Sequence, residues 1–148
     1  MNDLHPSDYY ALGEFRYQIR RFLHFSEEAA RAEGLEPQQH QMMLAIRAWR
    51  DTSGRPADPT IGDLAGHLLL KHHSAVGLVD RLTAHGLVQR MRADDDRRQV
   101  RVHLTPEGME KLKRLTSVHR QELIASGPLL VSALGSLLQG WAGGVPAR

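Results

Sequence analysis

The 148-residue sequence contains no cysteine. This absence excludes a disulfide framework, a zinc site built on thiolates and a cysteine nucleophile, and it excludes control by thiol oxidation. The sequence also lacks a glycine-rich phosphate loop, a nucleophile elbow and the His-Glu-x-x-His spacing of a zinc protease. It therefore carries no pattern typical of an enzyme, and we expect no catalytic residue.

The sequence also carries little net charge, because its 19 basic and 17 acidic residues leave a formal net charge of only +2. The basic residues are unevenly distributed, and one group gathers in the middle of the chain: Lys71, Arg81, Arg90, Arg92, Arg97, Arg98 and Arg101. A local basic surface of this kind is what a nucleic-acid binder needs. We find no apolar run near the length of about 20 residues that spans a bilayer, and no secretory signal. The sequence thus predicts a cytoplasmic protein with no membrane partner.

A helix-turn-helix pattern runs from Thr60 to Gly86. Thr60 is a favourable N-cap, and Asp63 stands where it completes a capping box before apolar residues recur at helical spacing. The helical period restarts after Lys71 and ends at Gly86, which suits the position after a helix C-cap. The second helix is expected to turn three apolar residues inward, namely Val76, Val79 and Leu82.

A β-hairpin with a charged tip follows the second helix. Leu87 to Arg92 and Gln99 to Leu104 are predicted strands, the second because its apolar and polar residues alternate. Residues 93–98, the connection, are too charged for a core and have a length suited to a hairpin loop. This order of elements is typical of a winged helix-turn-helix. It predicts binding to double-stranded DNA, with the second helix in the major groove and the wing in a minor groove.

Further helices flank this module. The apolar periodicity predicts four of them: from Ser7 to Glu33, from Pro37 through Trp49, from Pro106 to Gly127, and a last one from Pro128. Thr105 is the expected N-cap of the third. The first is longer than a compact winged domain can cover, and the last is too apolar for the surface of a small monomer. These two ends predict a homodimer. Its expected interface residues are Leu12, Phe15, Ile19, Leu130, Leu134 and Leu137.

The middle of the chain resembles the multiple antibiotic resistance regulator (MarR) family of bacterial transcription factors through LAGHLLLKHHSAVGLVDRLTAHGLVQR, then DRR, then LTPEG. The resemblance implies a mainly α-helical fold with a small β-wing, in which a winged helix-turn-helix core is flanked by N- and C-terminal dimerisation helices. It implies one domain over residues 1–148, with dimerisation helices in 7–36 and 106–141 and the DNA-binding module in 37–105. In that family an arginine of the wing tip, here Arg98, enters the minor groove and an aspartate, here Asp96, steadies it. The family often has a proline in the wing turn, where this sequence has aspartates at 94–96.

The candidate DNA-contacting residues lie at both helix starts, along the second helix and at the wing tip: Thr60, Lys71, His72, His73, Ser74, Gly77, Arg81, Asp96, Arg97 and Arg98. Several have a second interpretation. Ser74 either caps its helix or contacts a base, and the two histidines either read bases or lie at the surface. Arg81 is better placed for a phosphate, which positions a protein without reading sequence.

The resemblance also implies a small aromatic acid, phenol or drug as effector, held in a crevice between the dimer helices and the winged module. The candidate lining residues are Tyr17, Phe22, Phe25, Met42, Met43, Ile46 and His119. Aromatic and methionine residues at helical spacing also form ordinary cores, which is the alternative for each of them.

These observations together favour a homodimeric repressor of a palindromic operator, released by such a ligand. Two alternatives stay open. Nine histidines suggest a zinc-responsive regulator, and the basic module also suits a DNA-binding structural protein without effector control. No pair of histidines forms a convincing ligand set, so the sequence predicts neither a metal site nor a cofactor.

Overall fold

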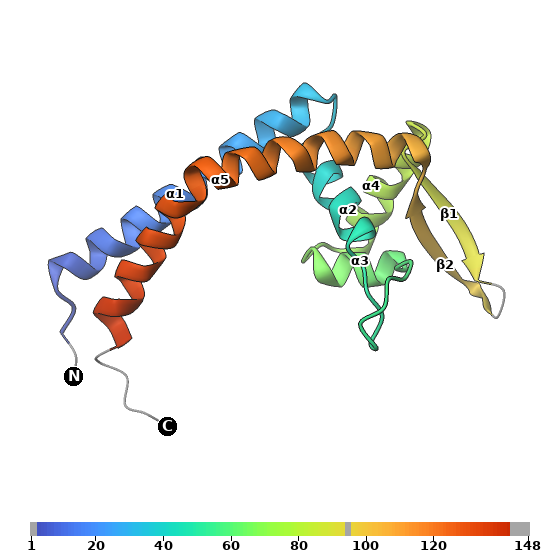
Figure 1. The fold of residues 1–148 in the computed structure, drawn as a ribbon. Helices are drawn as coiled ribbons and strands as arrows, with labels where there is room; N and C mark the ends of the chain where they lie inside the picture. The colour runs from blue at the N-terminus through green and yellow to red at the C-terminus, as the bar shows by residue number, and fades with distance from the viewer. Residues whose placement is uncertain (1–2, 94–95, 143–148) are drawn as a thin grey trace. The chain divides into compact units, whose positions relative to one another are not determined.

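The structure is a computed structural model that describes the backbone of residues 3–93 and 96–142, and the side chains of residues 93–98 lie outside its description. Its elements are α1 (Pro6–Ala32), α2 (Pro37–Arg47), α3 (Ile61–His67), α4 (His72–Ala84), β1 (Val88–Ala93), β2 (Asp96–Leu104) and α5 (Pro106–Ala142). The fold is mainly α-helical with a small antiparallel wing, as predicted (Figure 1). The chain forms two compact units: a winged unit of residues 30–116, and a terminal unit that joins the described residues up to 29 with those from 117 onward.

The core of the winged unit lies among α2, α3, α4, β2 and the start of α5. Its largest fully buried side chains are Met42, Met43, Leu64, Leu78, Leu82, Leu115, Val79 and Val102. The predicted inward stripe of α4 was partly wrong, because Val76 is only half-buried whereas Ala75 and Leu78 are buried. The helix packs against both α2 and α3 and also contacts β1. Its buried face is therefore wider than the narrow stripe that a single packing partner would require.

The turn between α3 and α4 contains the only described non-glycine residue with a positive φ, Leu69 at 57°. Its side chain is 92% exposed, so packing contributes little to holding it there. At the other end of α4 the chain turns at Gly86, whose φ of 71° suits the residue after the C-cap His85. The glycine confirms the predicted end of the helix.

The wing is joined to the start of α3. Val88 pairs with Leu104 and Arg90 with Val102 across the hairpin. The backbone N–H of Val102 donates to Pro59 O at 2.9 Å, and Thr60 forms an isolated bridge with Arg101, so residues 59–60 lie alongside β2. The predicted connection of residues 93–98 was too long, because β1 extends to Ala93 and β2 begins at Asp96. Backbone pairing continues into charged sequence that has no apolar alternation to signal a strand.

The base of the wing is locked to the first turn of α5. The Thr105 hydroxyl donates to Gly86 O at 2.6 Å and accepts from the Gly108 N–H at 3.1 Å, which confirms Thr105 as the cap of this helix. A Cβ on Gly108 would lie 2.1 Å from Leu87 O, so no other residue fits without moving the backbone. The glycine of the LTPEG segment is thus required by a close approach of two backbones.

In the terminal unit, α1 and the second half of α5 lie antiparallel. The Trp141 indole donates to the Asp8 carboxylate at 3.1 Å, and His119 Nε2 lies 2.8 Å from the Ser26 hydroxyl oxygen. The predicted break at Pro128 was wrong, because α5 is a single helix with Pro128 inside it. The proline removes one backbone hydrogen bond, to the carbonyl of Ile124, and that residue is 73% exposed, where water can solvate the carbonyl. Contacts with α1 on both sides of Pro128 keep the two halves in one helix.

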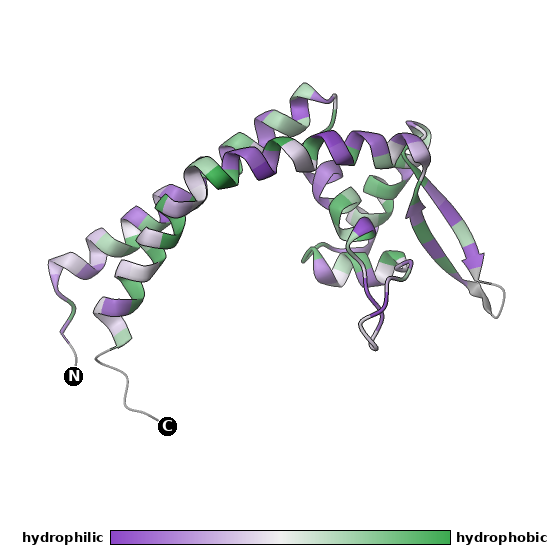
Figure 2. Ribbon diagram, viewed as in Figure 1, coloured by the Kyte–Doolittle hydropathy of each residue, from purple (hydrophilic) through white to green (hydrophobic). Residues whose placement is uncertain are grey.

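Because α5 is continuous, it also corrects the prediction that no apolar run approaches the length needed to span a bilayer. No charged residue occurs between Leu123 and Ala142, and Figure 2 shows this half of the helix as largely apolar. An 18-residue window of α5 reaches a mean hydropathy of 1.5, with 11% of it buried within the chain, so by length and composition alone the helix is able to cross a membrane. Helices that pair with a second protein chain satisfy the same test.

Candidate nucleic-acid interface

The N-terminal turn of α4 is the most accessible part of the helix-turn-helix. Lys71 occupies the N-cap with extended backbone and makes no side-chain cap bond. Lys71, His72, His73 and Ser74 are all exposed. The Ser74 N–H donates to Lys71 O at 3.0 Å, which places Ser74 one turn inside the helix and not at its cap. Its hydroxyl therefore has no capping role, and the four side chains form one polar surface at the helix start.

Further along α4, Arg81 is engaged by another helix. Its guanidinium lies 3.5 Å from the carboxylate of Glu36, the N-cap of α2, in a pair that is about half exposed on both sides. A Cβ built on Gly77 would lie 3.5 Å from Arg81 Nη1, so this arginine extends back over the half-buried glycine. A phosphate contact by Arg81 stays a prediction, and it would have to compete with Glu36.

Thr60 holds the start of α3 through the predicted capping box. Its hydroxyl accepts from the Asp63 N–H at 3.0 Å, and the Asp63 carboxylate accepts from the Thr60 N–H at 2.9 Å. The hydroxyl proton is not used in this pair, so it stays available to an acceptor outside the chain.

Three wing-tip candidates lie beyond what the structure describes in full. The backbone of Asp96, Arg97 and Arg98 belongs to β2, and their side chains lie outside the described residues. Their DNA contacts stay predictions.

Two other arginines of the basic group have structural partners that sequence reasoning missed. Arg90 forms an ion pair with Asp80, which ties the wing to α4, and Arg101 donates to Asp58 O at 2.7 Å, which ties β2 to the segment before α3. These pairs join residues 10 and 43 positions apart in the chain. No local spacing in the sequence signals them. The Asp80 carboxylate offsets the charge of Arg90, and the Asp58 carbonyl occupies a donor of Arg101, whereas Arg92 is exposed.

The residues predicted to line an effector crevice fall into two groups, one in each unit. In the winged unit, Met42 and Met43 are fully buried and Ile46 is 4% exposed, so all three belong to the core. In the terminal unit, the His119 ring makes edge contacts with Phe22 and Phe25, at centroid distances of 6.1 and 5.5 Å. Tyr17 is 49% exposed. Their role in ligand binding stays a prediction.

The residues predicted at the dimer interface divide between two faces of the terminal unit. Leu137 is 5% exposed and Ala133 8%, so this face of α5 is buried within the unit. Leu12 and Leu134 are 42% and 38% exposed, whereas Phe15, Ile19 and Leu130 are half-buried. Sequence reasoning missed a more exposed stripe on α5: Ile124 at 73%, Val131 at 71% and Leu138 at 54%. Their seven-residue spacing puts them on one face of the helix and was visible in the sequence.

Metal-ligand candidates do not gather in the part of the chain that the structure describes. There, no group of three or more His, Asp or Glu side chains is arranged to hold a metal ion. Two of the nine histidines lie against aromatic rings: His67 contacts the Trp49 ring edge-on at 5.7 Å, and His119 lies in the aromatic contact described above.

Comparison with known sequences places the match on the winged unit. Residues 33–99 match the sequence profile described as the MarR family. The chain is similar to an HTH-type transcriptional regulator, YsmB, of Bacillus subtilis (strain 168), with 40% identity over 67 residues. That match covers 45% of this chain and 45% of the relative, so it spans less than half of either protein.

Comparison with solved structures extends the likeness to most of the chain. AbsC, a MarR family transcriptional regulator from Streptomyces coelicolor, has a TM-score of 0.71 at 18% identity, covering 95% of this chain and 93% of its own. Wild-type MarR from E. coli has a TM-score of 0.66 at 19% identity, covering 94% and 98%. A mutant of MepR from S. aureus, bound to an oligodeoxyribonucleotide, has a TM-score of 0.64 at 17% identity, covering 85% and 94%. At such identities the structural likeness establishes the fold.

Proposed function

We propose that the chain belongs to the MarR family of winged helix-turn-helix proteins, whose profile matches residues 33–99, and that it is a transcriptional regulator that binds double-stranded DNA sequence-specifically. The observation that carries this proposal is the exposed start of α4, where Lys71, His72, His73 and Ser74 face solvent together. A helix N-terminus with polar and cationic side chains suits the edges of bases and the adjacent phosphates in a major groove. The MepR mutant with the same fold is bound to DNA.

The wing supplies the second contact of this proposal. Arg97 and Arg98 follow a hairpin turn, and arginines inserted into a narrow minor groove are favoured by its negative potential. The ion pair between Arg90 and Asp80 couples the wing to α4. The two reading elements are therefore positioned relative to each other by the protein before DNA arrives.

The proposed regulator acts as a homodimer through its terminal unit. The exposed stripe of Ile124, Val131 and Leu138, together with Leu134, gives α5 an apolar face on the side not buried within the unit. Large exposed apolar surfaces are typical of sites that bind another protein chain. A twofold dimer presents two α4 helices, so the expected operator is a palindrome with half-site centres about 10 base pairs, or one helical turn, apart.

The proposal extends to a cytoplasmic repressor that a small aromatic or phenolic ligand releases from its operator. Such a ligand shifts DNA affinity only if it binds the DNA-competent and incompetent arrangements unequally.

The test is a selection of binding sites from random duplex DNA by the purified protein at physiological salt. A palindrome with half-sites one turn apart is expected, and recovery without any consensus would favour a DNA-binding structural protein instead. Lys71→Ala should weaken binding to the selected site and lower the log–log salt slope by about one unit, because one phosphate-neutralising charge is lost. Lys113→Ala, which removes an exposed charge from α5, is the matched control.

A further inference from the structure

A small hairpin of residues 49–57, the α2–α3 hairpin, projects from the winged unit. The Asp51 N–H donates to Arg55 O at 2.8 Å near its tip, and an isolated antiparallel bridge joins its legs at positions 50 and 56. The chain reverses at Gly54, whose φ of 82° suits a residue without a side chain. Figure 1 shows the hairpin extending away from the first turns of α5, on the side to which the wing also extends. It is therefore an ordered second projection of this unit.

The Asp51 carboxylate holds the turn of the hairpin. One of its oxygens accepts from the Ser53 N–H at 2.8 Å, from the Ser53 hydroxyl at 2.6 Å and from the Arg55 N–H at 3.0 Å. The bond from the Ser53 hydroxyl, followed by that from the Arg55 N–H, lowers the pKa of Asp51 below its usual value. The carboxylate thus stays ionised at neutral pH, and its charge is directed at donors of the turn itself.

The hairpin contributes nothing to the core at its tip. Residues 50–56 are all exposed, and residues 51–54 carry no apolar side chain. A two-stranded hairpin is marginally stable by itself, and ordering each residue of backbone costs about 1–2 kcal/mol. Surface segments that a rigid scaffold holds in place are disproportionately the ones that carry binding residues. The order of this hairpin therefore indicates a contact outside the chain.

The base of the hairpin is fixed to the two elements that the proposed function places on DNA. On one side, the Trp49 ring contacts His67 of α3 edge-on at 5.7 Å. On the other side, Pro59 O accepts from the Val102 N–H of β2 at 2.9 Å, one residue before Thr60, the N-cap of α3. The hairpin is thus held beside the start of α3 and the wing.

The distance from the hairpin to the start of α3 is short. Arg55 precedes Thr60 by five residues, which is at most about 18 Å of extended chain. Consecutive phosphates of one DNA strand advance about 3.4 Å along the helix axis. A phosphate bound by Arg55 would therefore lie within about five base pairs of the phosphate at the start of α3.

The two arginines of the hairpin keep their charge. The Arg55 guanidinium makes no hydrogen bond or ion pair with the residues that the structure describes. Arg50 donates to Gly54 O at 3.2 Å, and a carbonyl group does not neutralise a guanidinium. Two cations and the single carboxylate of Asp51 leave the hairpin with a net positive charge.

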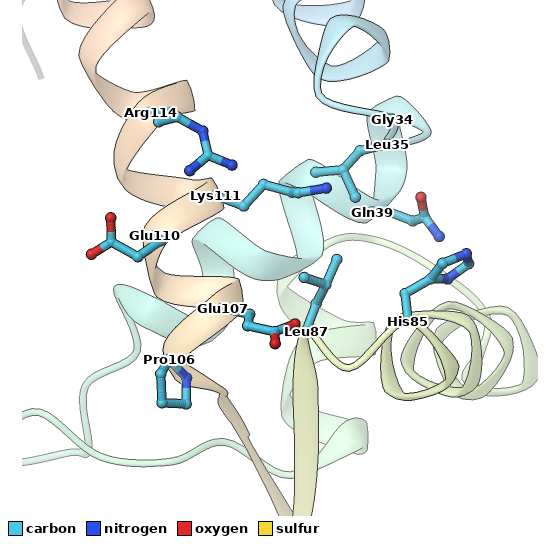
Figure 3. Close-up of a pocket in the computed structure, with 10 residues that line it drawn as sticks. All are labelled: Gly34, Leu35, Gln39, His85, Leu87, Pro106, Glu107, Glu110, Lys111 and Arg114. Carbon is cyan, nitrogen blue, oxygen red and sulfur yellow. The ribbon is translucent and has the colours of Figure 1, made fainter.

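Basic residues elsewhere in the winged unit are less available. A groove of about 530 Å³ between the start of α2, the end of α4 and the first turns of α5 carries Lys111 and Arg114 (Figure 3). Arg114 pairs with the Glu33 carboxylate at 3.1 Å, and Lys111 donates to Glu33 O at 2.8 Å. Glu107 and Glu110 also line this groove, so its acidic and basic residues balance. The groove offers an anion no net positive charge, in contrast to the hairpin.

We propose that the α2–α3 hairpin is a second DNA-contacting wing, in which Arg55 binds a phosphate of the sugar–phosphate backbone and Arg50 adds to the local positive charge. The planar fork of a guanidinium matches two oxygens of one phosphate. Such a contact positions the protein on the duplex without reading bases. This inference rests on the proposed function, because it adds a contact to the same complex with DNA.

The test measures binding of the full chain and its variants to the selected operator by fluorescence anisotropy over a range of salt concentrations. Arg55→Ala should lower the log–log salt slope by about one unit, because one phosphate-neutralising charge is lost. At about 0.15 M salt binding should weaken about fivefold, since each neutralised phosphate contributes a factor of the salt concentration to the power of about −0.9. Arg55→Lys should recover most of the slope. Lys113→Ala, which removes an exposed charge from α5, should leave both quantities unchanged.

Two further measurements separate a phosphate contact from other roles. Phosphate ethylation interference should detect a phosphate in each half-site that matters to the unmodified protein and not to Arg55→Ala, within about five base pairs of the start of α3. The binding sites that Arg55→Ala selects from random DNA should keep the same consensus, because the contact reads no base. Far-UV circular dichroism should show an unchanged fold, because the Arg55 side chain has no partner among the described residues.

The outcomes distinguish this proposal from the proposed function. Equal affinity and salt slope in Arg55→Ala and Lys113→Ala would overturn the second wing while DNA binding by the unmodified protein stands, and would direct the hairpin to an acidic protein partner instead. An altered consensus in Arg55→Ala would overturn the phosphate contact in favour of base reading. An unmodified protein that binds no DNA would overturn both proposals.

Discussion

Val131 offers the sharpest test of the dimer, because it lies at the centre of the exposed stripe on α5 with 71% of its surface accessible. Complete burial of a valine side chain contributes about 1.5–3 kcal/mol, so covering this one contributes about 1–2 kcal/mol. The twofold axis doubles that to about 2–4 kcal/mol per dimer. Val131→Asp removes this contribution and also buries an unpaired carboxylate from each subunit, which adds a further cost.

A total of about 4 kcal/mol or more corresponds to a dimer dissociation constant raised about a thousandfold. Sedimentation equilibrium over a range of concentrations measures this constant, and far-UV circular dichroism checks that the monomer keeps its helices. The fold should survive because the residue is exposed in the single chain. Ser136→Asp, an equal change of charge at an exposed position off the stripe, is the control. A Val131→Asp protein that dimerises within about threefold of the unmodified protein would show that this face does not form the interface.

Three further predictions concern the winged unit. Leu69→Gly should raise the free energy of unfolding by about 0.5–1 kcal/mol in thermal melts, because relief of the left-handed φ outweighs the added chain entropy; a lower melting temperature would contradict this. Thr60→Ala should lower the free energy of unfolding by about 1 kcal/mol because it removes the capping hydroxyl, whereas Thr60→Ser retains that hydroxyl. Equal stability of the two variants in urea unfolding would contradict this prediction. Arg98→Ala should weaken operator binding and lower the salt slope by about one unit, and an unchanged affinity in fluorescence anisotropy would remove Arg98 from the interface.

Short-range features of the winged unit were predictable because neighbouring residues carry them. Thr60 with Asp63, and Gly86 after α4, act through their own turn of backbone, so their residue types predict the helix ends. The wing was predicted from alternation between Gln99 and Leu104, and its extension to Asp96 was not, since charged residues carry no such alternation.

Predictions about α5 failed where packing overrides local preference. Pro128 after Gly127 is typical of a helix boundary, yet α5 continues because α1 contacts it on both sides of the proline. The same continuity turned two predicted helices into one long apolar segment. Leu137 and Val131 illustrate the consequence, because only the packing of α1 decides which leucine or valine faces inward.

The sequence by itself determined the order of helices and strands up to the start of α5, the caps at Thr60 and Thr105, and the polar start of α4, since each follows from residues within a few positions of one another. Only the tertiary structure decided that Arg90 and Arg101 are held by Asp80 and the Asp58 carbonyl, that Arg81 pairs with Glu36, and that Gln39 and Lys111 line one groove. These arrangements join residues far apart in the chain. Their geometry depends on how whole helices pack, which residue spacing does not encode.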